Sequence, residues 1–184
     1  MIDNQAEINV YSSLLKERKI FINGYIDEDM SNSVISKLLL LEYDDKTKDI
    51  ELYINSGGGI VQCGFAIYDM IKIISPDVST ICIGNACSMA AIILGGGTKG
   101  KRFSLPTSKI MIHQPRGSTC SATSSEIEIY SYELQKSKKD FIKCISSDTG
   151  QVLDKVKKDI EKDYYMTSSE AINYGLIDAI LRKR

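Results

Sequence analysis

Strand-like and helix-like segments alternate along almost the whole chain. Residues 49–55 (DIELYIN) alternate apolar and polar side chains, the pattern of a half-buried strand, and they run through a glycine loop into the helical pattern of residues 64–74. The expected strands cover 19–24, 49–55, 79–84, 101–105, 109–113 and 176–181. The expected helices cover 11–18, 31–43, 64–74, 85–94, 125–147, 151–162 and a short segment capped by Thr167 and Glu170. This order predicts an α/β fold with a mostly parallel sheet and flanking helices.

The longest expected helix, residues 125–147, should protrude from the body of the molecule. Ser125 and Glu128 fit a capping box at its start. At 1.5 Å per residue it is about 35 Å long. One apolar stripe follows the helix and consists of Ile127, Tyr130, Leu134, Phe141 and Ile145. Because this is more apolar surface than a lone subunit needs, the helix suits a contact between subunits.

The composition is that of an ordinary globular domain. Of the 184 residues 43% are hydrophobic, which is enough for one core and one domain over residues 1–184. The 23 Lys and Arg nearly balance the 24 Asp and Glu, so no charge excess points to nucleic acid or an anionic membrane. The apolar runs are shorter than a membrane span, and no signal peptide opens the chain. We therefore expect a cytoplasmic protein, or one in an organelle lumen, with five reduced cysteines.

The glycine-rich segment 95–102 (GGGTKGKR) resembles a phosphate-binding loop only in part. Arg102 stands where such a loop needs Ser or Thr to hold magnesium. The glycines also leave a helix and enter a strand, which is the reverse of the order that phosphate binding requires. We expect a helix-to-strand turn and no bound nucleotide.

Three separate segments combine into a more specific candidate site. They are the loop 56–59 (SGGG) after one strand, residues 84–91 (GNACSMAA) after the next, and His113 at the end of KIMIH. Loops at the carboxyl ends of neighbouring parallel strands converge on one crevice, so these segments can meet. Ser88 would lie near a helix start, where free N–H groups stabilise negative charge, and His113 could activate its hydroxyl. Taken singly, Ser88 fits a helix-capping serine and His113 a buried core histidine.

Six strings extend this pattern over nearly the whole chain from about residue 9: YSSLLKER, LYINSGGG, DVSTICIGNACSMAA, GKRFSLPTSKIMIHQP, IEKDYYMTSSEA and YGLID. In order and content the chain resembles the ClpP serine peptidase family. The 25-residue interval between Ser88 and His113 fits that family as well as the residue types do. The resemblance implies a ClpP/crotonase-like fold, in which residues from about 116 to 148 form the projecting handle.

The resemblance also assigns roles to individual residues. It implies that Ser88 is the nucleophile, His113 the general base and Asp163 the carboxylate that orients the imidazole. An oxyanion hole would be formed by the backbone N–H groups of Gly59 and Met89. Residues implied to line the substrate are Gly58, Pro115 and Arg116. Residues implied to receive ATPase loops are Tyr53, Ile73, Phe103, Leu105 and Leu181, for which core packing is an equal alternative.

Two further side chains compete for these roles. Asp159 lies four residues before Asp163, but the motif selects Asp163 and the helical pattern places Asp159 on a solvated face. Cys87 precedes Ser88 and could act as a thiolate. Adjacent residues at a helix start point about 100° apart, so only one can face the base, and Cys87 also fits a small buried residue.

The chain departs from the family pattern in four places. Gly57 replaces a proline, which should leave the oxyanion loop less preorganised, and Lys162 replaces an arginine that helps to join rings. Segment 116–125 lacks the Gly-Gln-Ala-Thr string and is one residue longer. The N-terminal segment, residues 1–10, is shorter than the one that forms axial pore loops.

The resemblance implies a serine endopeptidase that degrades unfolded polypeptides through an acyl-enzyme, without metal or other cofactor. It would assemble into heptameric rings, two of them stacked, and be fed by a Clp-type AAA+ ATPase, with a paralogous ClpP subunit as a possible further partner. Two alternatives stay open: a catalytically weak or silent ring subunit, and a crotonase-type acyl-CoA enzyme.

Overall fold

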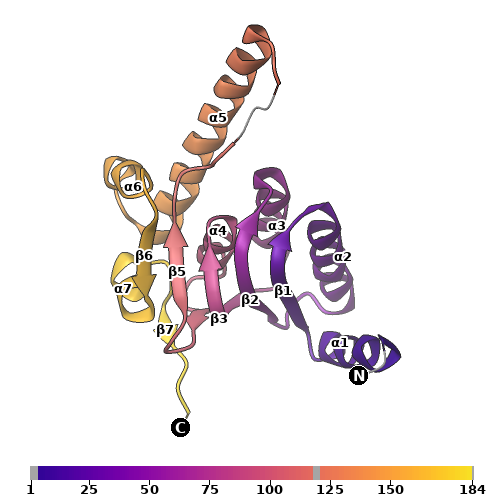
Figure 1. Cartoon of the computed structure of the whole chain (residues 1–184). Helices are drawn as coiled ribbons and strands as arrows, with labels where there is room; N and C mark the ends of the chain where they lie inside the picture. The colour runs from indigo at the N-terminus through magenta and orange to yellow at the C-terminus, as the bar shows by residue number, and fades with distance from the viewer. Residues whose placement is uncertain (1–3, 118–120, 184) are drawn as a thin grey trace.

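The computed structural model describes residues 4–117 and 121–183, which fold around one seven-stranded sheet (Figure 1). The strands are β1 (Lys19–Ile26), β2 (Ile50–Gly59), β3 (Val78–Cys87), β4 (Arg102–Ser104), β5 (Lys109–Ile112), β6 (Tyr164–Thr167) and β7 (Ala179–Ile180). Their order is β1-β2-β3-β4-β7, with β5 beside β3 and β6 beside β5. Every pair is parallel except β5–β6. The prediction of an α/β fold with a mostly parallel sheet is confirmed.

The helices are α1 (Asn4–Lys16), α2 (Glu28–Asp44), α3 (Val61–Ile73), α4 (Met89–Gly95), α5 (Ser124–Thr149), α6 (Leu153–Asp159) and α7 (Ser168–Tyr174). Helix α4 is entirely buried and packs on β2 and β3 and against α3. Helix α5 has 26 residues, and Figure 1 shows it projecting from the sheet. Within the described part of the chain, no helix is both long and apolar enough to span a membrane.

Strand β3 pairs with β2 along one edge, and β4 and β5 share its other edge. Residues Thr80 to Cys82 pair with β4, and Asn85 to Cys87 pair with β5. Because β5 supplies a partner for residues 85–87, the chain stays extended there, and the helix expected over 85–94 begins only at Met89. This correction moves Ser88 to the junction between strand and helix.

The ends of several other elements differ from expectation. Helix α5 is capped by Thr123 and Glu126 instead of Ser125 and Glu128, whereas the capping box of Thr167 and Glu170 is as predicted. Helix α1 begins earlier than residue 11, and α6 is shorter than 151–162. Strand β6 was not expected, because only Met166 of its four residues is buried and so no alternating apolar pattern marks it.

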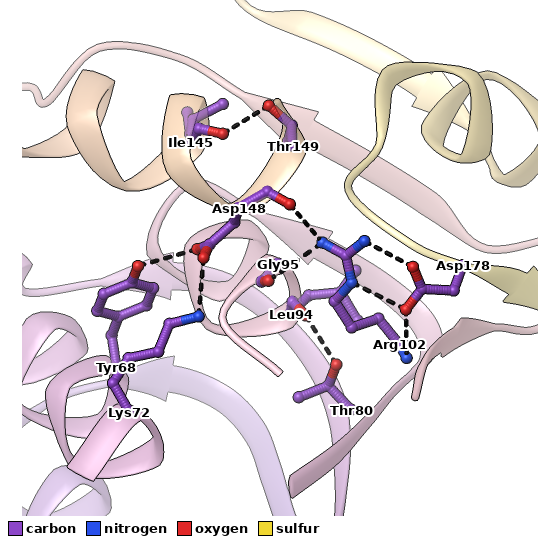
Figure 2. Close-up of polar contacts among 10 residues, drawn as sticks. All are labelled: Tyr68, Lys72, Thr80, Leu94, Gly95, Arg102, Ile145, Asp148, Thr149 and Asp178. Atoms are coloured by element: carbon purple, nitrogen blue, oxygen red, sulfur yellow. Dashed lines mark hydrogen bonds and ion pairs between the residues drawn. The ribbon is translucent and has the colours of Figure 1, made fainter. Parts of the chain in front are cut away.

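A buried arginine fixes the turn at residues 95–102. The Arg102 guanidinium forms an ion pair with Asp178 (2.6 Å) and donates to the Asp148 carbonyl oxygen (2.9 Å) at the base of α5. Figure 2 shows Asp148 between this arginine and the side chains of Tyr68 and Lys72, which bind its carboxylate at 2.9 and 2.7 Å. The turn therefore anchors the projecting helix to the sheet. This agrees with the prediction that residues 95–102 form a helix-to-strand turn.

Candidate active site

Ser88 occupies a strained backbone conformation at the end of β3. Its φ and ψ angles are 57° and −125°, a region that residues with a side chain rarely adopt. Ser88 is the N-cap residue of α4, but its side chain makes no capping hydrogen bond. The interpretation of Ser88 as a helix-capping serine is therefore wrong. A sharp strand-to-helix turn of this kind also holds the nucleophilic serine of α/β-hydrolases, and Ser88 lines a cavity.

The pairing of β3 with β5 brings Ser88 close to His113. Cys87 is in register with Met111, and the Ser88 amide donates to the Met111 carbonyl oxygen at 2.8 Å. Ser88 and His113 line one cavity of about 310 Å³. Gly57, Gly58 and Gly59, and the predicted substrate-lining residues Pro115 and Arg116, line the same cavity. Three segments that are distant in the sequence therefore converge at the carboxyl ends of β2, β3 and β5.

The antiparallel pair β5–β6 places Asp163 beside the imidazole. Ile112, the last residue of β5, is opposite Tyr164, the first residue of β6. His113 follows Ile112 and therefore faces Asp163, which precedes Tyr164. Nδ1 of His113 lies 3.4 Å from Oδ1 of Asp163. Gln114 holds the two segments together. Its backbone N–H donates to the Ile160 carbonyl oxygen, and its side-chain amide donates to the backbone carbonyl oxygen of Glu161. The sequence analysis gave Gln114 no role, although this residue lies in the quoted string GKRFSLPTSKIMIHQP.

The His113 ring is buried and incompletely paired. The residue is 9% exposed, and Nδ1 has no hydrogen-bond partner within the described part of the chain, since the contact with Asp163 is an ion-pair distance without hydrogen-bond geometry. Burial lowers the pKa of the imidazole, and the Arg116 charge lowers it further, while Asp163 raises it. His113 is therefore neutral at neutral pH and can accept a proton.

Arg116 binds the carboxylate of Asp163, which also faces His113. Its guanidinium forms an ion pair with Oδ1 of Asp163, and its side chain is 70% exposed. Sequence reasoning placed Arg116 in the substrate-lining surface but did not foresee this ion pair. The carboxylate that faces the histidine thus has a second, cationic partner.

The glycine segment 56–59, predicted as a loop, forms the last part of β2, and the Ser56 side chain holds it in place. The Ser56 hydroxyl donates to the Gly24 carbonyl oxygen and accepts from the Gly58 amide at 3.0 Å. Gly58 has φ +97°, and a Cβ atom there would lie 2.8 Å from Cβ of Ser88 and 3.2 Å from the Met89 nitrogen. Gly59 pairs with Ile26 of β1. The loop therefore packs directly against the Ser88–Met89 turn, and the roles of Gly59 and Met89 in an oxyanion hole stay predictions.

The two competing side chains have other surroundings. Asp159 accepts hydrogen bonds from Lys155 (2.7 Å) and Tyr174 (2.9 Å), and its side chain is only 16% exposed. The prediction that Asp159 lies on a solvated face is therefore wrong, because the Tyr174 side chain packs over its carboxylate. Burial, assisted by the Asp163 charge, raises the pKa of the Cys87 thiol, which disfavours a thiolate nucleophile.

The predicted ATPase-docking residues divide into two groups. Tyr53 and Phe103 are half-buried and lie in one row across the sheet, each in register with Ile81 of β3. Ile73, Leu105 and Leu181 are exposed, so core packing does not account for them.

Parts of two predicted features lie outside the described residues. These are residues 118–120 of segment 116–125, including Cys120, and residues 1–3 of the N-terminal segment. The four cysteines in the described part of the chain are free.

Comparison with known families agrees with this geometry. A family model described as Clp protease matches residues 3–184.

Proposed function

The chain belongs to the Clp protease family, and on that premise we propose that it is a serine endopeptidase that hydrolyses unfolded polypeptides through an acyl-enzyme on Ser88. One observation carries the proposal. The strained Ser88 and the buried, neutral His113 line the same cavity, beside a glycine loop that packs against the first turn of α4.

In the proposed reaction His113 removes the proton of the Ser88 hydroxyl as its oxygen attacks the substrate carbonyl carbon. The N–H groups of Gly59 and Met89 bind the resulting oxyanion. The imidazolium then protonates the leaving amine as the C–N bond breaks, and water releases the acyl group by the same steps in reverse order. Asp163 keeps the second ring nitrogen of His113 protonated and stabilises the imidazolium.

We also propose that the active form is a stack of two heptameric rings served by a Clp-type AAA+ ATPase. The outer half of α5 exposes Ile127, Ile129, Tyr130 and Tyr132, an apolar surface that a second subunit can cover. The exposed Ile73, Leu105 and Leu181 form part of the surface proposed for ATPase loops. A cytoplasmic location fits this role.

The proposal is tested by labelling Ser88 with a fluorophosphonate and by measuring peptide hydrolysis and native mass for the wild type and Ser88→Ala. We expect labelling and hydrolysis in the wild type, neither in Ser88→Ala, and the same assembly for both. Hydrolysis that survives in Ser88→Ala would contradict the assignment.

A catalytically weak ring subunit is the second candidate function. It is favoured by the unpaired Nδ1 of His113 and by the ion pair that engages Asp163 with Arg116. A protein that assembles in the presence of its ATPase but is not labelled at Ser88 would establish this alternative.

A further inference from the structure

We propose that Arg116 is a positioning residue: its guanidinium holds the Asp163 oxygen that faces His113 and keeps the His113–Asp163 pair in a weakened state. This inference rests on the proposed function, in which His113 is the general base. It explains why a complete set of triad residues is present while one member lacks its hydrogen bond.

The geometry supplies the first argument. Arg116 and the His113 ring both approach Oδ1 of Asp163, and only the arginine makes a hydrogen bond to it. Nδ1 of His113 stays 3.4 Å away and is buried without a partner. A buried N–H without an acceptor is unfavourable, so the imidazole would gain from a closer carboxylate.

Charge supplies the second argument. A carboxylate stabilises the imidazolium of the transition state only to the extent that its own charge is not neutralised by another cation. Arg116 neutralises Asp163 and also repels a proton on His113. The other charged groups at this place are Glu161 and Lys162, which line a second cavity with His113, Arg116 and Asp163. Lys138 of α5 binds Oε1 of Gln114 at 2.8 Å.

Exposure supplies the third argument. The Arg116 side chain is 70% exposed and the Asp163 side chain 34%, so their ion pair can open into solvent without disturbing the core. Its loss should therefore cost little stability, and the effect of replacing Arg116 should appear in the chemistry of His113.

The single histidine makes a direct test possible. The full chain is prepared without a histidine tag, with ¹³C-labelled histidine and with Ser88→Ala to prevent turnover, and the imidazole is titrated by NMR. We expect Arg116→Gln to raise the pKa of His113 relative to the parent, and Arg116→Lys to return it towards the parent value because the positive charge is restored. Lys157→Gln, which removes an exposed charge on α6, is the matched control and should leave the titration unchanged.

Kinetics in the Ser88 background give the second readout. If the freed carboxylate completes a hydrogen bond to Nδ1, Arg116→Gln should raise kcat for a neutral peptide about five-fold near pH 8, the equivalent of about 1 kcal/mol. KM should change less than kcat, because the peptide is neutral and Arg116, although it lines the Ser88 cavity, acts on the reaction through Asp163. The acid limb of the pH profile should move to higher pH, since a more basic imidazole stays protonated further into the neutral range.

The outcomes separate the two proposals. An unchanged His113 titration in Arg116→Gln, or a change in KM alone, overturns the positioning role even when Ser88 is labelled by a fluorophosphonate. A raised His113 pKa together with an unlabelled Ser88 in every variant supports the Arg116 contact and overturns the proposed peptidase activity instead.

Discussion

At the scale of single residues, two neighbouring glycines with different surroundings control the shape of the site. Gly58 has a positive φ and packs against Cβ of Ser88, whereas Gly57 has no atom within 4 Å of the position that its Cβ would take. The loop thus tolerates a side chain at one position and excludes it at the next. The Ser56 hydroxyl restrains this segment through its hydrogen bonds with Gly24 and Gly58.

Gly58→Ala should reduce kcat by about 100-fold or more, because the added methyl group displaces the loop from Met89 and with it the proposed oxyanion donors. Gly57→Ala should retain kcat within about two-fold, since the methyl group enters open space. Steady-state hydrolysis of a fluorogenic peptide measures both, with thermal unfolding to show that each variant folds. Equal losses in the two variants would exclude the loop as an oxyanion support.

The pH dependence of the wild type should reflect the buried imidazole. Burial and Arg116 lower the pKa of His113, so the base stays deprotonated below the pH at which a free imidazole, with a pKa of about 6.5, is half protonated. The acid limb of kcat/KM should therefore have its midpoint below about 6.5. A midpoint above that value would mean that the Asp163 charge outweighs burial.

At the scale of elements, the sequence pattern predicted most helices and strands but not the contacts that complete the site. Periodicity identifies segments that bury one face, such as β2 and α3. It could not find β6, which buries only Met166, or the end of β3, where pairing with β5 overrides the helical pattern of residues 85–88. Ser88 and His113 were found because residue type and spacing mark them. The Arg116 ion pair and the Gln114 bridge depend on the β5–β6 register, which leaves no pattern in the sequence.

The base of α5 should be sensitive to the loss of Asp148. Its side chain is 8% exposed and accepts from Tyr68 and Lys72, so Asp148→Ala should lower the free energy of unfolding by about 2–3 kcal/mol. Asp140→Ala on the same helix is the control. The Asp140 side chain is 56% exposed and pairs with Lys143, so its loss should cost less than about 0.5 kcal/mol. Urea unfolding of both variants measures the difference, and similar values would show that the network does not anchor the helix.

At the scale of the whole molecule, α5 carries apolar side chains well beyond the core. Phe141 and Ile145 near its C-terminal end are buried, while Ile127, Ile129 and Tyr132 near its start are exposed. Only part of the expected apolar stripe therefore packs within the subunit. The surface that we propose for contact between rings consists of the exposed part of this stripe, Ile127 and Tyr130, and of Ile129 and Tyr132 on another side of the same helix.

Ile129→Glu combined with Tyr132→Glu should prevent rings from pairing and halve the native mass, because two charges would be buried in an apolar contact. Lys139→Gln, an exposed change on the same helix, should leave the mass unchanged. Native mass spectrometry distinguishes the two results. A double variant with the wild-type mass would exclude this face of α5 from the assembly.

The four-residue pairing of β5 with β6 has a consequence for how activity can be lost. A slip of β6 by two residues preserves which side chains face the interior, because a strand repeats every second residue, but it carries Asp163 about 7 Å along the strand. Such a slip of β6 would move the Asp163 carboxylate away from the His113 imidazole while leaving the fold and its helix content intact. An inactive preparation of this kind would give the same circular dichroism spectrum as an active one.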